Sequence, residues 1–176
     1  YHSYDKGIAG IKNTVSVVNE NKFIYAGIND TEENRLKNNI EKLDLFEIKN
    51  AGNVLDEHVI GSIEYAVMHC GVKLIVIMGH QDCGAIAATL SGVSETKYIQ
   101  ALEDSIKPAI EDCKKDGLEI NSDNVVKAHL MQDIRELLNQ DSELVKYMKA
   151  HDVKIVPAYY HLDTGKVDFL KLENNI

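Results

Sequence analysis

His80 and Cys83 are the side chains whose types and spacing most directly suggest metal chemistry in this sequence. An imidazole nitrogen and a thiolate sulfur are ligands that zinc favours in proteins, at about 2.0–2.1 Å and 2.3 Å respectively. Glycines flank the segment that holds both residues, so a tight turn would let the two side chains face one point. The same spacing also fits a capping histidine beside a small buried thiol, and spacing alone does not separate the two interpretations.

The segment before His80 is the most apolar in the chain and is expected to position both residues. Residues 72–78 read VKLIVIM, and continuous hydrophobicity of this kind is typical of a parallel strand covered on both faces. Other strands are predicted at 22–28, 45–48, 153–160 and 166–170, the last two paired as a hairpin. Helices are predicted at 31–43, 56–70, from 85 onward, 97–115, 123–139 and 142–150. The expected fold class is α/β, with three α/β/α layers around a mostly parallel sheet and ligands at the carboxyl ends of its strands.

Composition narrows the classes of protein to which the chain can belong. A length of 176 residues without repeats or linkers predicts a single domain spanning 1–176. The net charge of −9 argues against nucleic acid or an anionic membrane as partner. No apolar run approaches the roughly 20 residues of a membrane span, and the first residues do not have the form of a signal peptide. Three cysteines favour a reducing compartment, so we expect a cytoplasmic location, with an export signal removed before Tyr1 as the alternative.

Three longer stretches of sequence resemble the β-class carbonic anhydrases. Residues 45–88, LFEIKNAGNVLDEHVIGSIEYAVMHCGVKLIVIMGHQDCGAIAA, are similar to the family core, which runs from a basic-Asn-Ala-Gly-Asn loop through a Ser-[Leu/Ile]-Glu-Tyr-Ala helix to a strand ending Gly-His-x-x-Cys-Gly. DNVVKAHLMQDI resembles the family helix that begins Asn-Val, and AYYHLDTGKVDFL resembles its closing hairpin. The resemblance implies zinc as cofactor with His80 and Cys83 as ligands, carbon dioxide and bicarbonate as substrates, and a homodimer or higher homo-oligomer. Residues 1–21 would then form the N-terminal helical arm.

One motif departs from the family pattern and alters the implied chemistry. The family's third zinc ligand opens a Cys-x-Asp-Ser-Arg motif, which here aligns with 28–32, so Ile28 replaces the cysteine and Glu32 replaces the arginine. In the family, zinc lowers the pKa of a water towards about 7 and the Asp-Arg pair keeps the aspartate away from the metal. Asp30 has no such partner beside Glu32, so we expect it to serve both as the catalytic aspartate and as the third ligand. Arg35, about one helical turn beyond Glu32, could fold back towards Asp30, but a solvated arginine on the helix face is the favoured interpretation.

Two further positions are candidate substrate-binding residues by the same resemblance. Lys49 precedes the Asn-Ala-Gly-Asn loop and is expected to steer bicarbonate, with pairing to a loop carboxylate as the alternative. Gly84 closes the zinc motif. Asp82 is expected to be a turn residue rather than a base. The remaining residues with ligand-type side chains lack the spacing of metal ligands: His58, His69, His129, His151, His161, Cys70 and Cys113.

The sequence therefore leaves three functional hypotheses. The first is a carbonic anhydrase-like zinc protein in which hydration of carbon dioxide is weak or lost. The second is a non-catalytic relative that uses the cleft for an anion or a partner. The third is a zinc hydrolase of a small linear heterocumulene such as carbonyl sulfide or carbon disulfide.

Overall fold

The computed structural model describes residues 23–25, 45–139 and 142–172. Its strands are β1 (Phe23–Tyr25), β2 (Leu45–Glu47), β3 (Leu74–His80), β4 (Lys154–Tyr160) and β5 (Val167–Phe169). Its helices are the short 3-10 helix η2 (Ala51–Asn53), α3 (Glu57–His69), α4 (Gly84–Ser91), α5 (Lys97–Lys115), α6 (Ser122–Asn139) and α7 (Glu143–His151). The helix predicted at 31–43 and the arm at 1–21 lie outside these residues.

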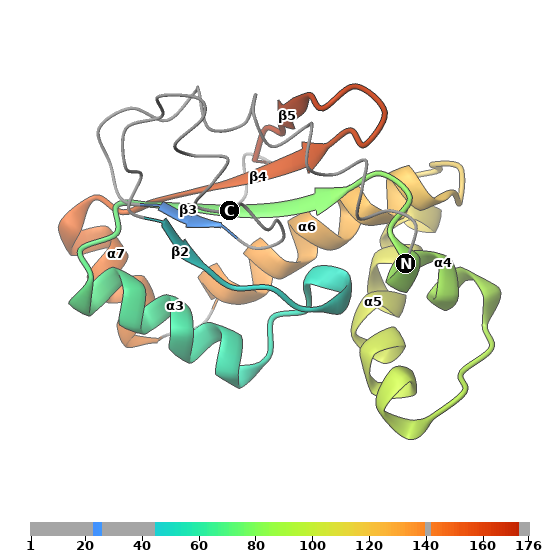
Figure 1. Cartoon of the computed structure of the whole chain (residues 1–176), viewed down its shortest axis with the longest axis horizontal. Coiled ribbons are helices and arrows are strands. Elements are labelled where there is room, and N and C mark those ends of the chain that lie inside the picture. The colour runs from blue at the N-terminus through green and yellow to red at the C-terminus, as the bar shows by residue number, and fades with distance from the viewer. Residues whose placement is uncertain (1–22, 26–44, 140–141, 173–176) are drawn as a thin grey trace, which may run out of the picture.

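The strands form one sheet in the order β2-β1-β3-β4-β5 (Figure 1). The β2–β1, β1–β3 and β3–β4 pairs are parallel, and only the hairpin between β4 and β5 is antiparallel. This arrangement confirms the mostly parallel sheet and the closing hairpin that the sequence predicts. Because β3 is central, its carboxyl end lies in the part of a parallel sheet where ligands usually bind.

The sequence prediction placed His80 just after the strand, and this was wrong by two residues. β3 ends at His80, because β4 continues to pair with it as far as Tyr160. The pairing extends past the strand, since the Gln81 N–H donates to the Tyr160 carbonyl at 2.9 Å. The backbone of His80 is therefore held by the sheet and not by a loop.

Helices α3, α6 and α7 lie against one face of the sheet, and α4 and α5 pack beside its carboxyl end (Figure 1). Successive side chains of β3 point to opposite faces of the sheet, so alternate residues belong to two different apolar clusters. Ile75 and Ile77 join the larger core with the helices, whereas Val76 and Met78 join Ala158 and Tyr160 on the other face. Both faces of β3 therefore bury apolar side chains, as its continuous hydrophobicity predicted.

Local sequence signals set the ends of two predicted helices. The Asp56 side chain accepts hydrogen bonds from the His58 and Val59 N–H groups at the start of α3. Gly71 follows the end of α3 with a φ of 72°, a conformation that glycine adopts without strain. The Thr96 side chain accepts from the Ile99 N–H and begins α5 at the predicted residue.

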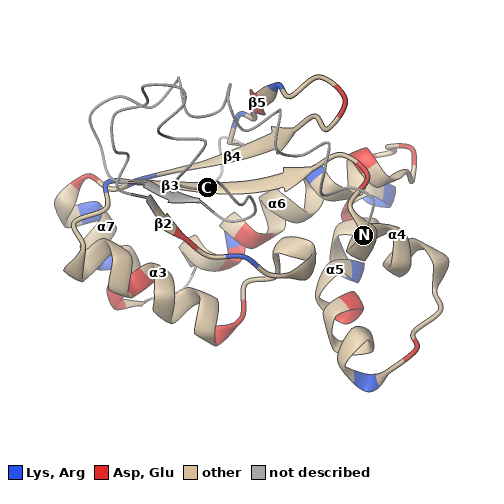
Figure 2. Cartoon of the chain, viewed as in Figure 1, with Lys and Arg blue, Asp and Glu red and all other residues tan. Residues whose placement is uncertain are grey.

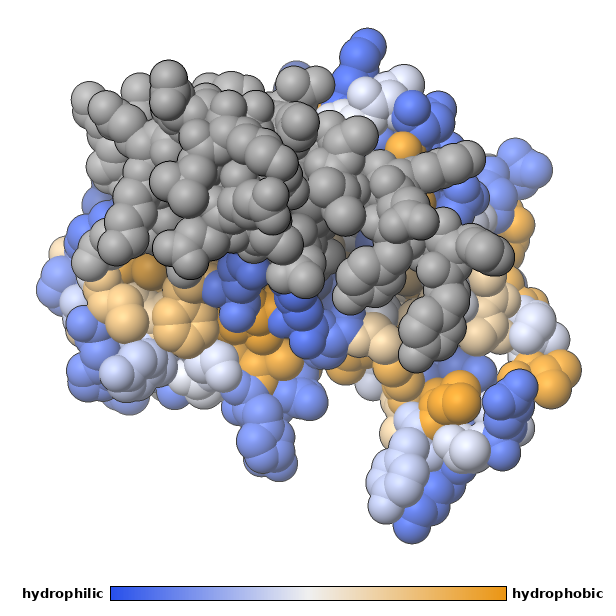
Figure 3. Space-filling model, in the orientation of Figure 1, coloured by the Kyte–Doolittle hydropathy of each residue, from blue (hydrophilic) through white to orange (hydrophobic). Residues whose placement is uncertain are grey.

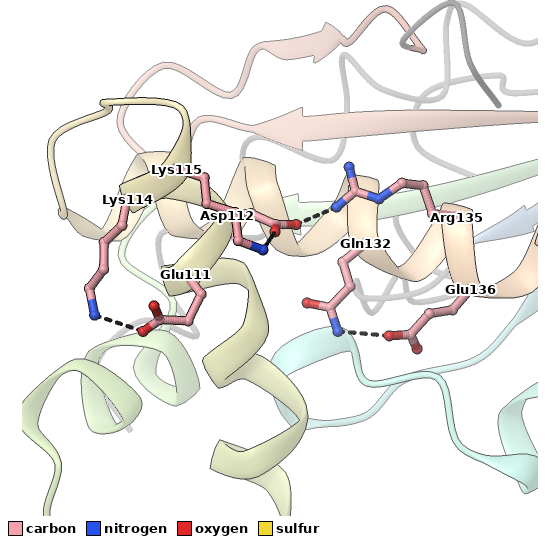
Figure 4. Close-up of polar contacts among 7 residues, drawn as sticks. All are labelled: Glu111, Asp112, Lys114, Lys115, Gln132, Arg135 and Glu136. Atoms are coloured by element: carbon pink, nitrogen blue, oxygen red, sulfur yellow. Dashed lines mark hydrogen bonds and ion pairs between the residues drawn. The ribbon is translucent and has the colours of Figure 1, made fainter.

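Charged residues of both signs are scattered over the helices (Figure 2). An ion pair between Arg135 of α6 and Asp112 of α5 links the two helices, with Lys115 on the other side of Asp112 (Figure 4). Within the described residues, no helix has both the length and the apolar character needed to cross a membrane.

Candidate metal and substrate site

A cavity of about 60 Å³ lies at the carboxyl end of β3. It is enclosed by residues from four elements and the segments that join them. The lining residues are Asn50, Gly52, Asn53, Met78, Gly79, His80, Cys83, Ile86, Val126, His129 and Leu130. Its wall is therefore largely apolar, with a few convergent polar groups, which is the usual composition of a small-ligand site.

Gly79 allows α6 to approach the end of β3. A Cβ atom at this position would lie 2.5 Å from Val126 Cγ1 and 3.3 Å from Leu130 Cδ1. Both contacts come from α6, whose side chains form one wall of the cavity. Glycine is required here for packing rather than for backbone conformation, and it sets the distance between the sheet and the helix.

The segment 50–53 forms the opposite wall and has the turn conformations that its sequence predicted. Gly52 and Asn53 both have positive φ, at 71° and 58°. A Cβ at Gly52 would also lie 2.9 Å from Ile106 Cδ1, so a side chain there would have to displace this methyl group. The Asn50 side chain donates to the Val54 carbonyl at 2.6 Å and closes this turn.

His80 and Cys83 line the same cavity and interact through their side chains. The Cys83 side chain is the main cause that raises the pKa of His80, and burial opposes it. Burial raises the pKa of the Cys83 thiol, but His80 and the N–H groups of Ile86 and Ala85 outweigh burial and hold the pKa below its usual value. The positive end of α4 therefore favours a thiolate at Cys83, the residue just before the first residue of that helix.

His80 has the tautomer that a metal ligand needs. Its Nδ1 lies 2.8 Å from the Gln81 carbonyl oxygen, which can only accept, so Nδ1 carries the proton. Nε2 is therefore the nitrogen that would coordinate a metal, since backbone carbonyls orient metal-binding histidines in the same way.

The donor set fits zinc by type but is incomplete within the described part of the chain. Imidazole and thiolate suit zinc, and the lowered pKa of Cys83 favours the charged form that binds metal. Among the described residues, however, no group of three or more His, Cys, Asp or Glu side chains can hold a metal ion. Asp30, the predicted third ligand and catalytic residue, lies outside these residues, as do Ile28, Glu32 and Arg35.

The two predicted substrate-binding residues lie near the cavity but do not line it. Lys49 Nζ lies 3.1 Å from Glu47 Oε2, which is the carboxylate pairing named as its alternative role. Gly84 begins α4 directly after Cys83, and a Cβ there would meet no atom within 4 Å. Asp82 is exposed with a φ of 54°, as expected of a turn residue.

His129 is the functional candidate that sequence reasoning did not find. It has no ligand spacing to another histidine in the sequence, yet it lines the cavity and its side chain is buried. The sequence feature that could have identified His129 is its position on the apolar face of α6, three residues after Val126 and next to Leu130. A polar side chain on the buried apolar face of a helix needs a hydrogen-bond partner, which is either another group of the protein or a ligand.

Fold and site together define an α/β protein with a His–Cys pair at the carboxyl edge of a parallel sheet. The carbonic anhydrase family model matches residues 34–167. The chain belongs to the β-carbonic anhydrase family. The matched segment begins after residues 28–32, the segment that was expected to align with the family motif Cys-x-Asp-Ser-Arg.

Individual relatives agree with this assignment. The carbonic anhydrase of Mycolicibacterium smegmatis is 34% identical over 129 residues, which is 71% of this chain and 62% of the relative. Carbonic anhydrase 2 of Mycobacterium tuberculosis is 32% identical over 127 residues, or 70% of this chain and 61% of the relative. The chain therefore matches less than two thirds of the length of either protein.

Solved structures support the fold. A tetrameric β-carbonic anhydrase from Sordaria macrospora has a TM-score of 0.68 at 18% identity, covering 92% of this chain and 86% of the other. A β-carbonic anhydrase from Aspergillus fumigatus has the same TM-score at 21% identity, with coverage of 93% and 81%. The α/β fold class expected from the sequence is thereby confirmed.

Proposed function

We propose that this chain is a zinc-binding member of the β-carbonic anhydrase family in which hydration of carbon dioxide to bicarbonate is weak or lost. The observation that carries the proposal is the pairing of His80 with Cys83 beside a cavity at the end of β3. We infer the substrates from membership of the family. We infer the reduced rate from the aligned segment 28–32.

The protein would orient and charge both ligand side chains before zinc binds. The Gln81 carbonyl orients the His80 ring and makes Nε2 the metal-binding nitrogen, while the start of α4 favours the thiolate of Cys83. When bound, zinc would supply a water acidic enough to provide a nucleophile near neutral pH. Ile86, Val126 and Leu130 give the cavity an apolar wall that suits an uncharged substrate such as carbon dioxide.

The third position of the site carries the proposed defect. Ile28 offers no ligand atom, and Glu32 offers no positive charge to hold the Asp30 carboxylate. Asp30 would then complete the metal coordination and occupy the position that water needs. Zinc affinity would be lower than with a second thiolate, because the carboxylate is a harder ligand.

Metal analysis of site variants tests this proposal. The protein loaded with zinc and then dialysed should retain about one equivalent, and His80→Ala and Cys83→Ala should each lose most of it. His58→Ala and Cys70→Ala are matched controls, because both residues lie on α3 or its cap and neither lines the cavity. Equal zinc content in site variants and controls would contradict the proposal.

We also propose that the chain forms at least a homodimer. The Sordaria macrospora relatives of similar fold are described as tetrameric. Apolar side chains reach the surface where α4 leads into α5 (Figure 3), including Val93 with 70% and Tyr98 with 75% of its surface exposed. Light scattering should give at least twice the chain mass at micromolar concentration, and a monomer at that concentration would contradict the assembly.

A further inference from the structure

Segment 50–53 forms a thin wall between the cavity and the solvent. Asn50 lines the cavity and is an exposed residue, and Ala51 is exposed as well. Gly52 and Asn53 also line the cavity, and both are half-buried. A 3-10 helix of three residues, such as η2, makes too few internal hydrogen bonds to maintain its conformation alone. The position of this wall therefore depends on contacts with other elements.

The wall lies directly against the start of α4, beside Cys83. A Cβ at Gly52 would lie 3.2 Å from Ala85 Cβ, and Ala85 is two residues after Cys83. The same Cβ would lie 2.9 Å from Ile106 Cδ1 of α5. Cys83 lines the cavity and is 8% exposed. Movement of the segment away from α4 would therefore widen the path from the solvent to the Cys83 thiol.

One hydrogen bond joins this wall to α6, on the opposite side of the cavity. His129 of α6 is 3% exposed, and its Nε2 lies 2.9 Å from the Gly52 carbonyl oxygen. That oxygen can only accept, so Nε2 carries the proton and donates it. Asp133 Oδ2 lies 3.7 Å from the same nitrogen, which is too far for a hydrogen bond. Among the described residues, no other hydrogen bond joins segment 50–53 to another helix or strand.

We propose that His129 is a positioning residue that holds segment 50–53 closed against the cavity and so limits access to Cys83. The apolar contacts at Gly52 are non-directional, whereas the hydrogen bond from His129 fixes where the Gly52 carbonyl lies. Without this bond the segment moves away from α4 more often, and small molecules reach Cys83 faster. That this path serves zinc and carbon dioxide rests on the proposed function, but the opening is measured without either.

The three cysteines provide the measurement, because they lie in different parts of one chain. The zinc-free protein is alkylated with iodoacetamide, and mass spectrometry gives the rate at each cysteine. Cys83 reports access to the cavity. Cys70 follows the end of α3, is partly exposed and does not line the cavity, so it reports the activity of the reagent. Cys113 is 0% exposed on α5, so it reacts only when the protein opens more widely.

Two substitutions separate the hydrogen bond from the bulk of the side chain. His129→Leu keeps a side chain of similar size at the buried position and removes the donor. In His129→Gln the terminal amide extends towards the former Nε2 position, so it can still donate to the Gly52 carbonyl. Leu137→Ala is the control for a general loss of stability, because Leu137 is 1% exposed on α6 and does not line the cavity.

The rate at Cys83, divided by the rate at Cys70, should rise about tenfold in His129→Leu, the scale expected when one buried hydrogen bond is lost. In His129→Gln the ratio should stay within about threefold of the unchanged protein, because the donor is kept. Cys113 should remain slow in both variants. Leu137→Ala should speed alkylation of Cys83 and Cys113 by similar factors.

Three results would overturn the role of His129: an unchanged rate at Cys83 in folded His129→Leu, an equal increase in His129→Gln, or an increase at Cys113 as large as that at Cys83. If His129→Leu does not fold, hydrogen exchange in the unchanged protein decides. The Nε2–H of His129 should exchange as fast as Cys83 becomes accessible, and exchange as slow as the opening at Cys113 would equally overturn the role.

Zinc gives a separate test of the proposed function in the same assay. Bound zinc should protect Cys83 from alkylation, because the thiolate would then be a metal ligand. Failure of zinc to protect Cys83 would overturn the proposed function alone, since the effect of His129 is measured in the zinc-free protein.

Discussion

Replacing Asp133 by asparagine should make the stability of this protein less dependent on pH. The carboxyl group is 2% exposed, and burial is the main cause that raises its pKa to about 9, with Glu136 adding to the effect. In the unfolded chain the same group has the ordinary value of 3.8. Between these two values the folded protein holds a proton that the unfolded chain releases. The free energy of unfolding therefore falls as pH rises, and the stability contributed by the neutral group is complete only below about pH 4.

The size of the effect follows from the width of this window. A difference of about five pH units at about 1.36 kcal/mol each gives an upper limit of about 7 kcal/mol. Between pH 7 and 8.5, above the ordinary histidine range, the loss should reach about 2 kcal/mol. Asparagine has nearly the shape of the neutral acid and cannot ionise. The free energy of unfolding of Asp133→Asn should therefore equal that of the unchanged protein near pH 4. Between pH 7 and 8.5 the difference between the two proteins should grow by about 2 kcal/mol in favour of Asp133→Asn.

Denaturant unfolding at fixed protein concentration and several pH values measures this difference. Asp116→Asn is the matched control, because Asp116 is exposed at the end of α5. Its unfolding free energy should follow the same slope with pH as that of the unchanged protein. If the free energy of unfolding changes with pH at the same slope in Asp133→Asn and in the unchanged protein, Asp133 is not a buried, neutral carboxyl group.

Two further predictions concern packing at the cavity and the aligned third-ligand segment. Gly79→Ala places a Cβ 2.5 Å from Val126 Cγ1 and should lower the free energy of unfolding by about 1–3 kcal/mol, whereas Gly61→Ala, with no atom within 4 Å, should be neutral or stabilising in denaturant titrations. Equal stability of the two variants would exclude the close approach of α6. The double change Ile28→Cys with Glu32→Arg should raise both zinc content and hydration rate more than the sum of the single changes, because both act on one site. If the gains in zinc content and hydration rate are additive or absent, Ile28 and Glu32 are not the shared cause of low activity.

The sequence predicts most of the fold because its signals are local. The helix predicted at 97–115 agrees with α5 at both ends, since Thr96 caps its start and Gly117, with a φ of 68°, follows its end. The alternation of strands and helices was sufficient to predict a parallel sheet. The end of β3 was misplaced because pairing with Tyr160 of β4, far along the chain, extends the strand to His80.

The candidate site was predictable only where the residues are close in sequence. His80 and Cys83 lie in one motif, so their shared location could be predicted before the structure. His129 joins them through the packing of α6 against the segment at Gly52, and this contact joins residues 77 positions apart. Hydrophobic periodicity places His129 on a buried face but does not reveal which carbonyl it meets.

Stopped-flow hydration of carbon dioxide by the zinc-loaded protein tests the central claim most directly. The Mycolicibacterium smegmatis carbonic anhydrase should be assayed alongside it under identical conditions. We predict that zinc is retained and that the rate is lower than that of the relative by about a hundredfold or more, the scale expected when a supporting charge and a ligand are lost. A zinc-loaded protein that hydrates carbon dioxide as fast as the relative would contradict the account, because Asp30 or another residue would then replace the missing groups fully.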